Sequence, residues 1–368
     1  MNSFGRKFRV SIFGESHGEA IGAVIDGVPA GLELSADDFA GDILRRKSGA
    51  FGTTPRKEAD LPILLSGVYE GQTTGAPLTI IFQNGNVRSQ DYSHFMDVPR
   101  PGHADYTAAV KWYDCNDPRG GGHFSGRLTL PIVAAGVVAK KVLADATLLD
   151  EVPVPVEGIR ATLVELGGIP RPEPVRKICG ACANEILDAI GLNAPSIFEN
   201  SADDLPQEWQ QALEEAVREG DSLGAVVECR AHLSAGIGEP FWDSVESVIS
   251  HAVFSIPGVR GIEFGDGFMA AAMRGSEHND PFGPDGRPMK NGAGGINGGI
   301  TNGAELCFRV AFKPTSSIAR FQKTYDFSEK KMTDLKIGGR HDVCFALRTP
   351  VIVEAMAAIA LADLVQLR

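Results

Sequence analysis

The sequence predicts one continuous domain of the α+β class over residues 1–368, because strand-like and helix-like segments alternate along its whole length. Hydrophobic residues make up 43% of the chain, which is typical of a soluble protein with a sizeable core. A chain of 368 residues could hold two ordinary domains, but no Pro/Ser-rich linker or reliable repeat divides it. The 43 glycines predict many tight turns and close backbone approaches.

Six segments rich in β-branched residues and bounded by Gly, Pro or Asn predict strands. In chain order they are 7–13, 21–27, 61–66, 77–82, 155–166 and 224–232. Between the second and third of them, Ser35 and Asp38 form a capping-box pattern that predicts a helix ending near Arg46.

Four further segments predict helices. The segment from Arg127 to Ala144 is so apolar that most of its surface should be buried. Residues 206–218 predict a charged amphipathic helix. Helix signals return at 242–254 and at 350–366, where Pro350 suits the first turn.

Three long glycine-rich connections, at 84–103, 114–126 and 275–304, carry most of the distinctive polar residues. Long connections inside a compact protein are commonly functional, and we interpret these three in that way.

The bulk properties predict a cytoplasmic protein that binds neither nucleic acid nor membranes. A net charge of −12 opposes binding to polyanions. No secretory signal is visible at the start of the chain, and the most apolar segment, 128–138, is too short to span a bilayer. Six scattered cysteines suit a reducing compartment, and we interpret the C-x-x-C pair Cys179 and Cys182 as structural.

Histidines and arginines stand beside glycines in four places. Ser16 and His17 lie in a GESHG turn at 14–18, and His103 follows Arg100 in RPGHAD. The other two segments are RGGGHFSGR at 119–127 and GRHD at 339–342. Arginines form bidentate pairs with anions, and histidines titrate near neutrality. The pattern predicts an enzyme that acts on an anionic small molecule.

Three glycine motifs admit other interpretations. Residues 14–18 match G-x-S-x-G, but the following segment is strand-like and no upstream oxyanion loop precedes it, so we do not favour a serine hydrolase. Residues 265–270 match G-x-G-x-x-A without a clear helix behind it, and we expect a tight turn lining a pocket. The glycine-rich run 292–301 predicts backbone N–H groups that no side chain covers and that can bind an anion. A lysine and three hydroxyl side chains follow at 313–317. That second segment could hold a phosphate or the polar edge of a ring cofactor.

We interpret four of the eight histidines, at 94, 232, 251 and 278, as surface or core residues. No ligand spacing connects the histidines, so no metal site is predicted.

Taken together, these motifs resemble the chorismate synthase family in order and almost from end to end. The matching segments include GESHG, RPGHADYT (100–107), RGGGHFSGR, GIEFGDGF (261–268), KPTSSI (313–318) and GRHDVC (339–344). The resemblance implies a β-α-β sandwich and a homotetramer. It also implies the loss of phosphate and the C6 hydrogen from 5-enolpyruvylshikimate 3-phosphate to give chorismate. Reduced FMN would be required and would come from an external source, since no extra reductase segment is visible.

The resemblance also assigns roles to residues. His17 would neutralise the leaving phosphate with Ser16 beside it, His103 would set the protonation of the flavin N1/C2=O edge, and Asp342 would help N5 act as a base. The substrate anions would be bound by Arg46, Arg100, Arg127 and Arg340. The flavin would be bound by His123, Phe124, Ser125, Gly298, Lys313, Pro314, Thr315, Ser316 and Ser317, together with Arg340.

The sequence departs from the family pattern in two places. His123-Phe124 replaces an Arg-Ser pair that contacts FMN in many members. The loop 45–54 is one residue shorter than usual and lacks an arginine that is expected just before the Thr pair. One contact to the substrate or to a nicotinamide (NADP) depends on that arginine. The alternative interpretation is therefore a relative that still binds flavin or a phosphometabolite but has lost catalysis.

Overall fold

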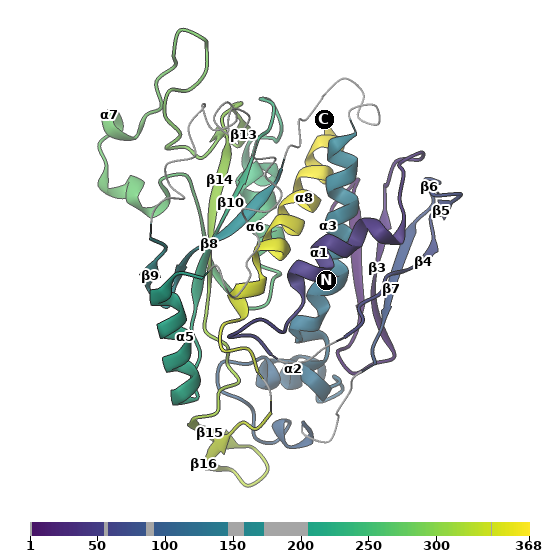
Figure 1. The fold of residues 1–368 in the computed structure, drawn as a ribbon, viewed down its shortest axis with the longest axis vertical. Helices are drawn as coiled ribbons and strands as arrows, with labels where there is room; N and C mark the ends of the chain where they lie inside the picture. The colour runs from purple at the N-terminus through teal and green to yellow at the C-terminus, as the bar shows by residue number, and fades with distance from the viewer. Residues whose placement is uncertain (1, 55–57, 86–91, 146–157, 173–204, 340) are drawn as a thin grey trace.

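Two antiparallel sheets enclose a layer of helices (Figure 1). The computed structural model describes residues 2–54, 58–85, 92–145, 158–172, 205–339 and 341–368. Buried apolar side chains from both sheets and from the helices between them form one continuous cluster. This arrangement confirms the predicted β-α-β sandwich.

The first sheet has the order β1-β2-β3-β7-β4. Its strands are β1 (Ser3–Phe4), β2 (Arg9–Gly14), β3 (Ala20–Asp26), β7 (Leu78–Gln83) and β4 (Ile63–Ser66). Alternate residues of β3 and β7, such as Ile21 and Ile80, are fully buried against the helices. The four strands predicted in this region are confirmed to within two residues. The short strands β5 (Val68–Tyr69) and β6 (Gln72–Thr73) form a separate hairpin.

The second sheet has the order β11-β14-β10-β8-β9. Its strands are β8 (Arg160–Leu166), β9 (Ile169–Pro170), β10 (Ala225–Ala231), β11 (Val259–Phe264) and β14 (Leu306–Phe312). The predicted strand 224–232 is β10, and the described part of 155–166 contains β8. Two small hairpins lie outside this sheet: β12 (Ile296–Asn297) with β13 (Ile300–Thr301), and β15 (Phe321–Asp326) with β16 (Lys331–Lys336).

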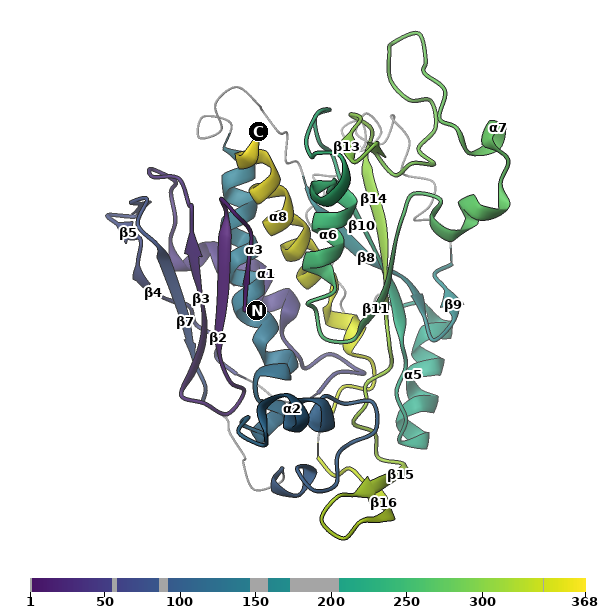
Figure 2. The ribbon, with the colours of Figure 1, turned by 180° about the vertical axis from the view of Figure 1, so that it is seen from behind.

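The helical layer consists of α1 (Ala40–Arg46), α3 (Thr129–Ala144), α6 (Val245–Val253) and α8 (Pro350–Leu367), seen from behind in Figure 2. A 3-10 turn at Ala36–Phe39 leads into α1, and the Asp38 carboxylate accepts a hydrogen bond from the Ser35 amide at 2.7 Å, as the capping box predicts. By length and hydropathy α8 could span a membrane, but it is buried from Pro350 to Val365 inside the fold. It is longer than the apolar segment 128–138, which was too short to span a bilayer.

Three helices lie outside this layer: α2 (Asp105–Trp112), α5 (Gln207–Glu219) and α7 (Gly275–His278). In α5 the buried residues Trp209, Leu213 and Ala216 form one stripe, so the predicted amphipathic helix is confirmed.

Helices α3 and α8 touch at Gly136. A Cβ atom at this position would lie 2.3 Å from the Cβ and 2.5 Å from the Cα of Ala355. We expect Gly136→Ala to lower the free energy of unfolding by about 1–3 kcal/mol through overpacking, despite the better helix propensity of alanine. Gly41→Ala in α1 is the matched control, because its Cβ would meet nothing within 4 Å. Urea titration should show destabilisation of the first variant only, and equal stabilisation of both would contradict this packing.

Two buried carboxylates on α8 bind distant parts of the chain. Glu354 is fully buried and accepts two hydrogen bonds of 2.7 Å from Arg45, one of 3.0 Å from Lys140 and one from the amide of Ala161. Asp363 accepts hydrogen bonds from three successive amides, those of residues 6, 7 and 8, at 2.8, 2.6 and 3.0 Å. Through these contacts α8 holds α1, α3, β8 and the turn between β1 and β2.

Candidate active site

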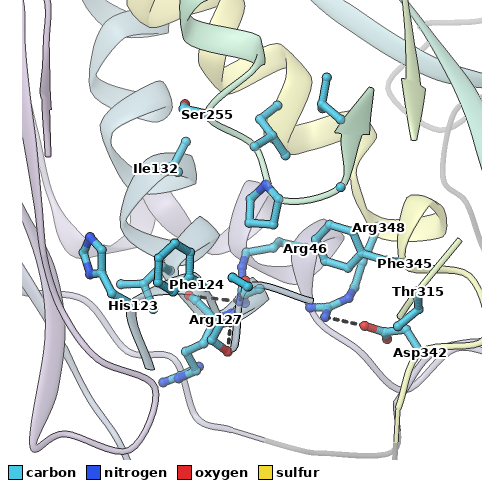
Figure 3. Close-up of a pocket in the computed structure, with 18 of the residues that line it drawn as sticks. Arg46, His123, Phe124, Arg127, Ile132, Ser255, Thr315, Asp342, Phe345 and Arg348 are labelled. Carbon is cyan, nitrogen blue, oxygen red and sulfur yellow. Dashed lines mark hydrogen bonds and ion pairs between the residues drawn. The ribbon is translucent and has the colours of Figure 1, made fainter. Parts of the chain in front are cut away.

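A cavity of about 1510 Å³ lies where the β2–β3 turn, the start of α3 and the loops after residues 99, 312 and 338 meet (Figure 3). The predicted functional loop 114–126 contributes residues 120 and 123–126 to its lining. The described part of 84–103 contributes Tyr92, Gly102 and His103. Segments that are far apart in the sequence thus form one site.

The β2–β3 turn packs against three glycines of the 119–124 segment. Gly120, Gly121 and Gly122 have φ values of +62°, +82° and +55°, which glycine adopts most easily. The Ser16 amide donates to the Gly122 carbonyl at 3.1 Å, and His123 Nδ1 donates to the Gly14 carbonyl at 2.8 Å. A Cβ on Gly120 would lie 2.6 Å from the His17 ring and 2.8 Å from Ser16 Oγ. Only glycine therefore lets this loop approach the two residues.

His17 lines the cavity and packs edge-on against Tyr92, with ring centroids 5.4 Å apart. Ser16 is 1% exposed, and its hydroxyl has no hydrogen-bond partner among the described residues. Ser16 lies next to the lining and not in it. The segment after this turn is the strand β3, which confirms the argument against a nucleophile elbow.

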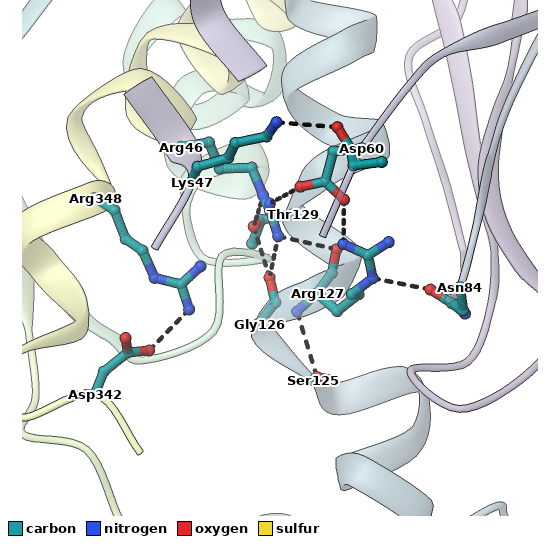
Figure 4. Close-up of polar contacts among 11 residues, drawn as sticks. Arg46, Lys47, Asp60, Asn84, Ser125, Gly126, Arg127, Thr129, Asp342 and Arg348 are labelled. Atoms are coloured by element: carbon teal, nitrogen blue, oxygen red, sulfur yellow. Dashed lines mark hydrogen bonds and ion pairs between the residues drawn. The ribbon is translucent and has the colours of Figure 1, made fainter. Parts of the chain in front are cut away.

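Two arginines share one buried carboxylate (Figure 4). Asp60 binds Arg127 Nη1 through Oδ1 at 2.5 Å and Arg46 Nη1 through Oδ2 at 3.5 Å. Burial and the positive charges of Arg348 and Arg127 lower the pKa of Arg46 to about 9. Arg127 Nε donates to Asn84 at 2.8 Å, while its Nη2 is buried with no partner among the described residues. That nitrogen is available to an anion.

A third arginine, Arg348, lines the same cavity and donates to Asp342 Oδ2 at 2.8 Å. The other oxygen of Asp342 accepts from the Thr54 amide at 2.8 Å. Arg348 Nε is buried with no partner among the described residues. Sequence reasoning missed both Arg348 and Asp60, because neither stands in a glycine-rich motif. The contact between Asp60 and Arg127 joins residues 67 positions apart, so local spacing gives no sign of it.

The segment 313–317 closes another side of the cavity. Lys313 Nζ donates to the Gly102 carbonyl at 2.8 Å and to Ser316 Oγ at 2.5 Å, so it fastens this segment to the loop that carries His103. Burial and the charge of Arg260 lower the pKa of Lys313. Thr315 Oγ1 is buried without a partner among the described residues.

Most of the predicted site residues line this one cavity. They are Arg46, His17, His103, His123, Phe124, Ser125, Arg127, Lys313, Pro314, Thr315, Ser316, Ser317 and Asp342. His251, interpreted from sequence as an ordinary histidine, also lines it, as does His341, whose pKa burial lowers. Arg340 and the Cys179–Cys182 pair lie outside the described residues.

Besides Ser16, two predicted residues are not among the described residues that line the cavity. Arg100 is 5% exposed and is bound by Asp105 through two hydrogen bonds of 2.7 Å. Gly298 lies in the turn between β12 and β13, and neither strand lines the cavity. The structure therefore does not bring these two to the cavity.

The glycine-rich run 292–301 binds an anion from its own chain. The amides of Gly292 and Ala293 donate to the two carboxylate oxygens of Asp280 at 2.8 and 2.9 Å. Residues 265–270 do form a tight turn, with φ of +55° at Gly265 and +56° at Gly267. Neither this turn nor the described segment 275–304 lines the cavity, so the functional interpretation of that connection stays a prediction.

Comparison with known proteins gives one consistent result. The chorismate synthase family matches residues 8–366. The chain is 50% identical to a chorismate synthase of Chitinophaga pinensis over 99% of its length and 96% of that protein, and 40% identical to one of Pyrococcus abyssi over 98% and 96%. A crystal structure of a chorismate synthase superposes with a TM-score of 0.68 at 27% identity, covering 98% of this chain and 92% of the other. The chain belongs to the chorismate synthase family.

Proposed function

We propose that the chain converts 5-enolpyruvylshikimate 3-phosphate into chorismate by a 1,4-elimination of phosphate and the C6 hydrogen, as a carbon–oxygen lyase of the shikimate pathway. The observation that carries this proposal is the convergence of four arginines and five histidines on one cavity in a chain of net charge −12. A substrate with a phosphate and two carboxylates needs such a local positive site.

The cavity residues fit a flavin as well as the substrate. A volume of about 1510 Å³ exceeds what one small metabolite fills, and part of the wall is apolar, including Phe124, Ile132 and Ile256. The unpartnered Thr315 hydroxyl offers a hydrogen bond to the polar edge of a ring. Residues 123–125 and 313–317 would hold reduced FMN. When bound, it supplies electron density to the departing allylic system and a base for the C6 proton.

The chain's own residues would prepare the substrate for this reaction. Arg127 and Arg348 each offer a buried N–H without a partner among the described residues, so each can bind a substrate anion without breaking an existing contact. His17, as an imidazolium, would donate to the phosphate and stabilise its departure. The packing of Gly120 over His17 and Ser16 excludes water from this side of the ring.

On the flavin side, His103 would hold a proton near the N1/C2=O edge of the flavin ring. Asp342 would help the flavin N5 act as a base. Both oxygens of Asp342 are already hydrogen-bonded, to Thr54 and Arg348, and this fixes the carboxylate plane. A fixed carboxylate needs no reorganisation during the reaction.

We also propose a cytoplasmic homotetramer that receives reduced flavin from outside. Large apolar side chains on the surface, such as Leu65, Trp242 and Phe268, support association of several copies.

The test is an anaerobic incubation with chemically reduced FMN and 5-enolpyruvylshikimate 3-phosphate, with chorismate followed by absorbance. We expect product from the parent, none with oxidised FMN, and a loss of about 10²–10⁴ in rate for both His17→Ala and His103→Ala. Flavin binding without product from the parent would instead identify a relative that has lost catalysis. In that case a large gain in flavin affinity in the His123→Arg variant would show that the flavin site is degraded at position 123.

A further inference from the structure

The loop at 100–105 contains a hydrogen-bonded network that lies behind His103. Asp105, at the start of α2, receives hydrogen bonds of 2.7 Å from both Nε and Nη2 of Arg100. Its Oδ1 is also 2.6 Å from His103 Nδ1. The side chains of Arg100 and Asp105 are 4% and 10% exposed, whereas His103 lines the cavity. The carboxylate therefore connects a buried arginine to a histidine in the site.

Asp105 is held in its charged form. Burial raises its pKa, but the hydrogen bonds from Arg100 and His103 and their positive charges lower it by more, so the pKa lies well below its usual range. A charged carboxylate only accepts hydrogen bonds, so the short contact requires a proton on His103 Nδ1. The 3.1 Å contact between Arg100 Nη2 and the same Nδ1 is then a contact of two donors. The shorter, charge-assisted bond decides the tautomer.

His103 lines the cavity while its Nδ1 is engaged by Asp105, which is not part of the lining. Its Nε2 and Cε1 each lie 3.7 Å from the position that a Cβ on Gly121 would take. With its proton on Nδ1, the neutral ring presents a lone pair at Nε2, and the charged ring presents an N–H there. A partner that holds the proton on Nδ1 therefore determines that a ligand meets Nε2, as an acceptor in the neutral ring or as a donor in the charged ring.

Arg100 has little capacity left for a substrate. Two of its nitrogens bind Asp105, Nη1 donates to Ser317 Oγ at 3.2 Å, and the guanidinium stacks 4.5 Å above the Phe95 ring. A substrate anion would have to break a buried bidentate pair, which is costly. The geometry opposes the role of substrate ligand that the sequence suggested for Arg100.

We propose that Arg100 and Asp105 are positioning residues that fix His103 as the Nδ1–H tautomer, which leaves Nε2 as the ring nitrogen for a ligand. Neither touches the substrate in this assignment. The catalytic consequence rests on the proposed function, but the tautomer itself does not depend on it.

The first test is ¹⁵N NMR of the histidine rings in the full-length parent, with the His103 signal assigned by its loss in His103→Gln. We expect protonation at Nδ1 in the parent and loss of that preference in Asp105→Asn, since an asparagine amide can donate or accept. Glu305→Gln is the matched control, because it neutralises a carboxylate paired with Arg230 at 2.7 Å outside the cavity lining. Protonation of His103 at Nε2 in the parent overturns the proposal, whatever the spectrum of Asp105→Asn shows.

The second test separates positioning from substrate binding by kinetics. We expect Arg100→Gln to lower kcat by roughly 10-fold or more while KM for the substrate stays within about twofold. A large rise in KM with kcat unchanged would make Arg100 a substrate ligand and overturn its assignment. If the parent forms no chorismate, the proposed function fails, and the NMR result still decides the tautomer.

Discussion

A Gly120→Ala variant is expected to lose chorismate formation by at least about 10²-fold while remaining folded. The new Cβ would lie 2.6 Å from His17 Nε2 and 2.8 Å from Ser16 Oγ, well inside van der Waals contact. Either His17 or the loop must then move, and a displacement of about 1 Å in a catalytic group costs on the order of 10²-fold in rate. The φ of +62° adds roughly 1–2 kcal/mol of backbone strain for any residue with a Cβ.

The Gly121→Ala variant is the control that separates the effect of the steric clash with His17 from the effect of the backbone strain. Its φ is +82°, so the backbone cost is similar, but its nearest neighbour would be the His103 ring at 3.7 Å, an ordinary contact. Both variants should lose similar stability in thermal unfolding, and only Gly120→Ala should lose most of its activity in the reduced-flavin assay. Equal activities in the two variants would show that the position of His17 does not depend on this contact.

A Glu354→Ala variant is expected to be the most destabilised of those considered, by about 3–5 kcal/mol. The substitution removes a fully buried carboxylate. The side chains of Arg45 and Lys140 and the amide of Ala161 then lose the acceptor of their hydrogen bonds. Guanidinium titration at neutral pH measures this loss. Asp26→Ala removes an exposed ion pair with Arg9 and should change stability by no more than about 1 kcal/mol.

The contribution of Glu354 should also depend on pH. Burial raises its pKa, but the hydrogen bond from Arg45 and the charges of Lys140 and Arg45 lower it below the ordinary value. A folded-state pKa below the unfolded value, about 4.3, gives stability that is present above that pH and declines as the pH falls below it. The stability difference between the parent and Glu354→Gln should therefore shrink in acid. A difference that grows in acid would mean that Glu354 is protonated in the folded protein.

The regular elements could be predicted because their signals are local. The alternation in β3 and β10, and the apolar stripe of α5, each arise from neighbours within one segment. The glycine-rich motifs around residues 17, 103 and 123 marked the cavity for the same reason. Each needs an unusual backbone that only certain residues allow.

The sequence is least informative where a side chain's partner is distant or hidden. It shows that Arg100 is charged but not that Asp105 already accepts hydrogen bonds from it. The run 292–301 has the composition of an anion site, but two of its amides already donate to Asp280. Asp60 and Arg348 were missed because their importance comes from contacts with Arg127 and Asp342 that exist only in the folded chain.

The contacts of α8 have a consequence for how the protein is made. Residues 6–8 leave the ribosome long before residue 363, whose carboxylate binds their amides. The apolar surfaces of α3 and β8 that α8 covers therefore stay exposed until α8 has been synthesised. Contacts of such long sequence separation form slowly, and exposed apolar strands are prone to aggregate in the meantime. We therefore expect a nascent chain that lacks α8 to bind chaperones, and its cavity is complete only once Met356 and Ile359 of α8 line it.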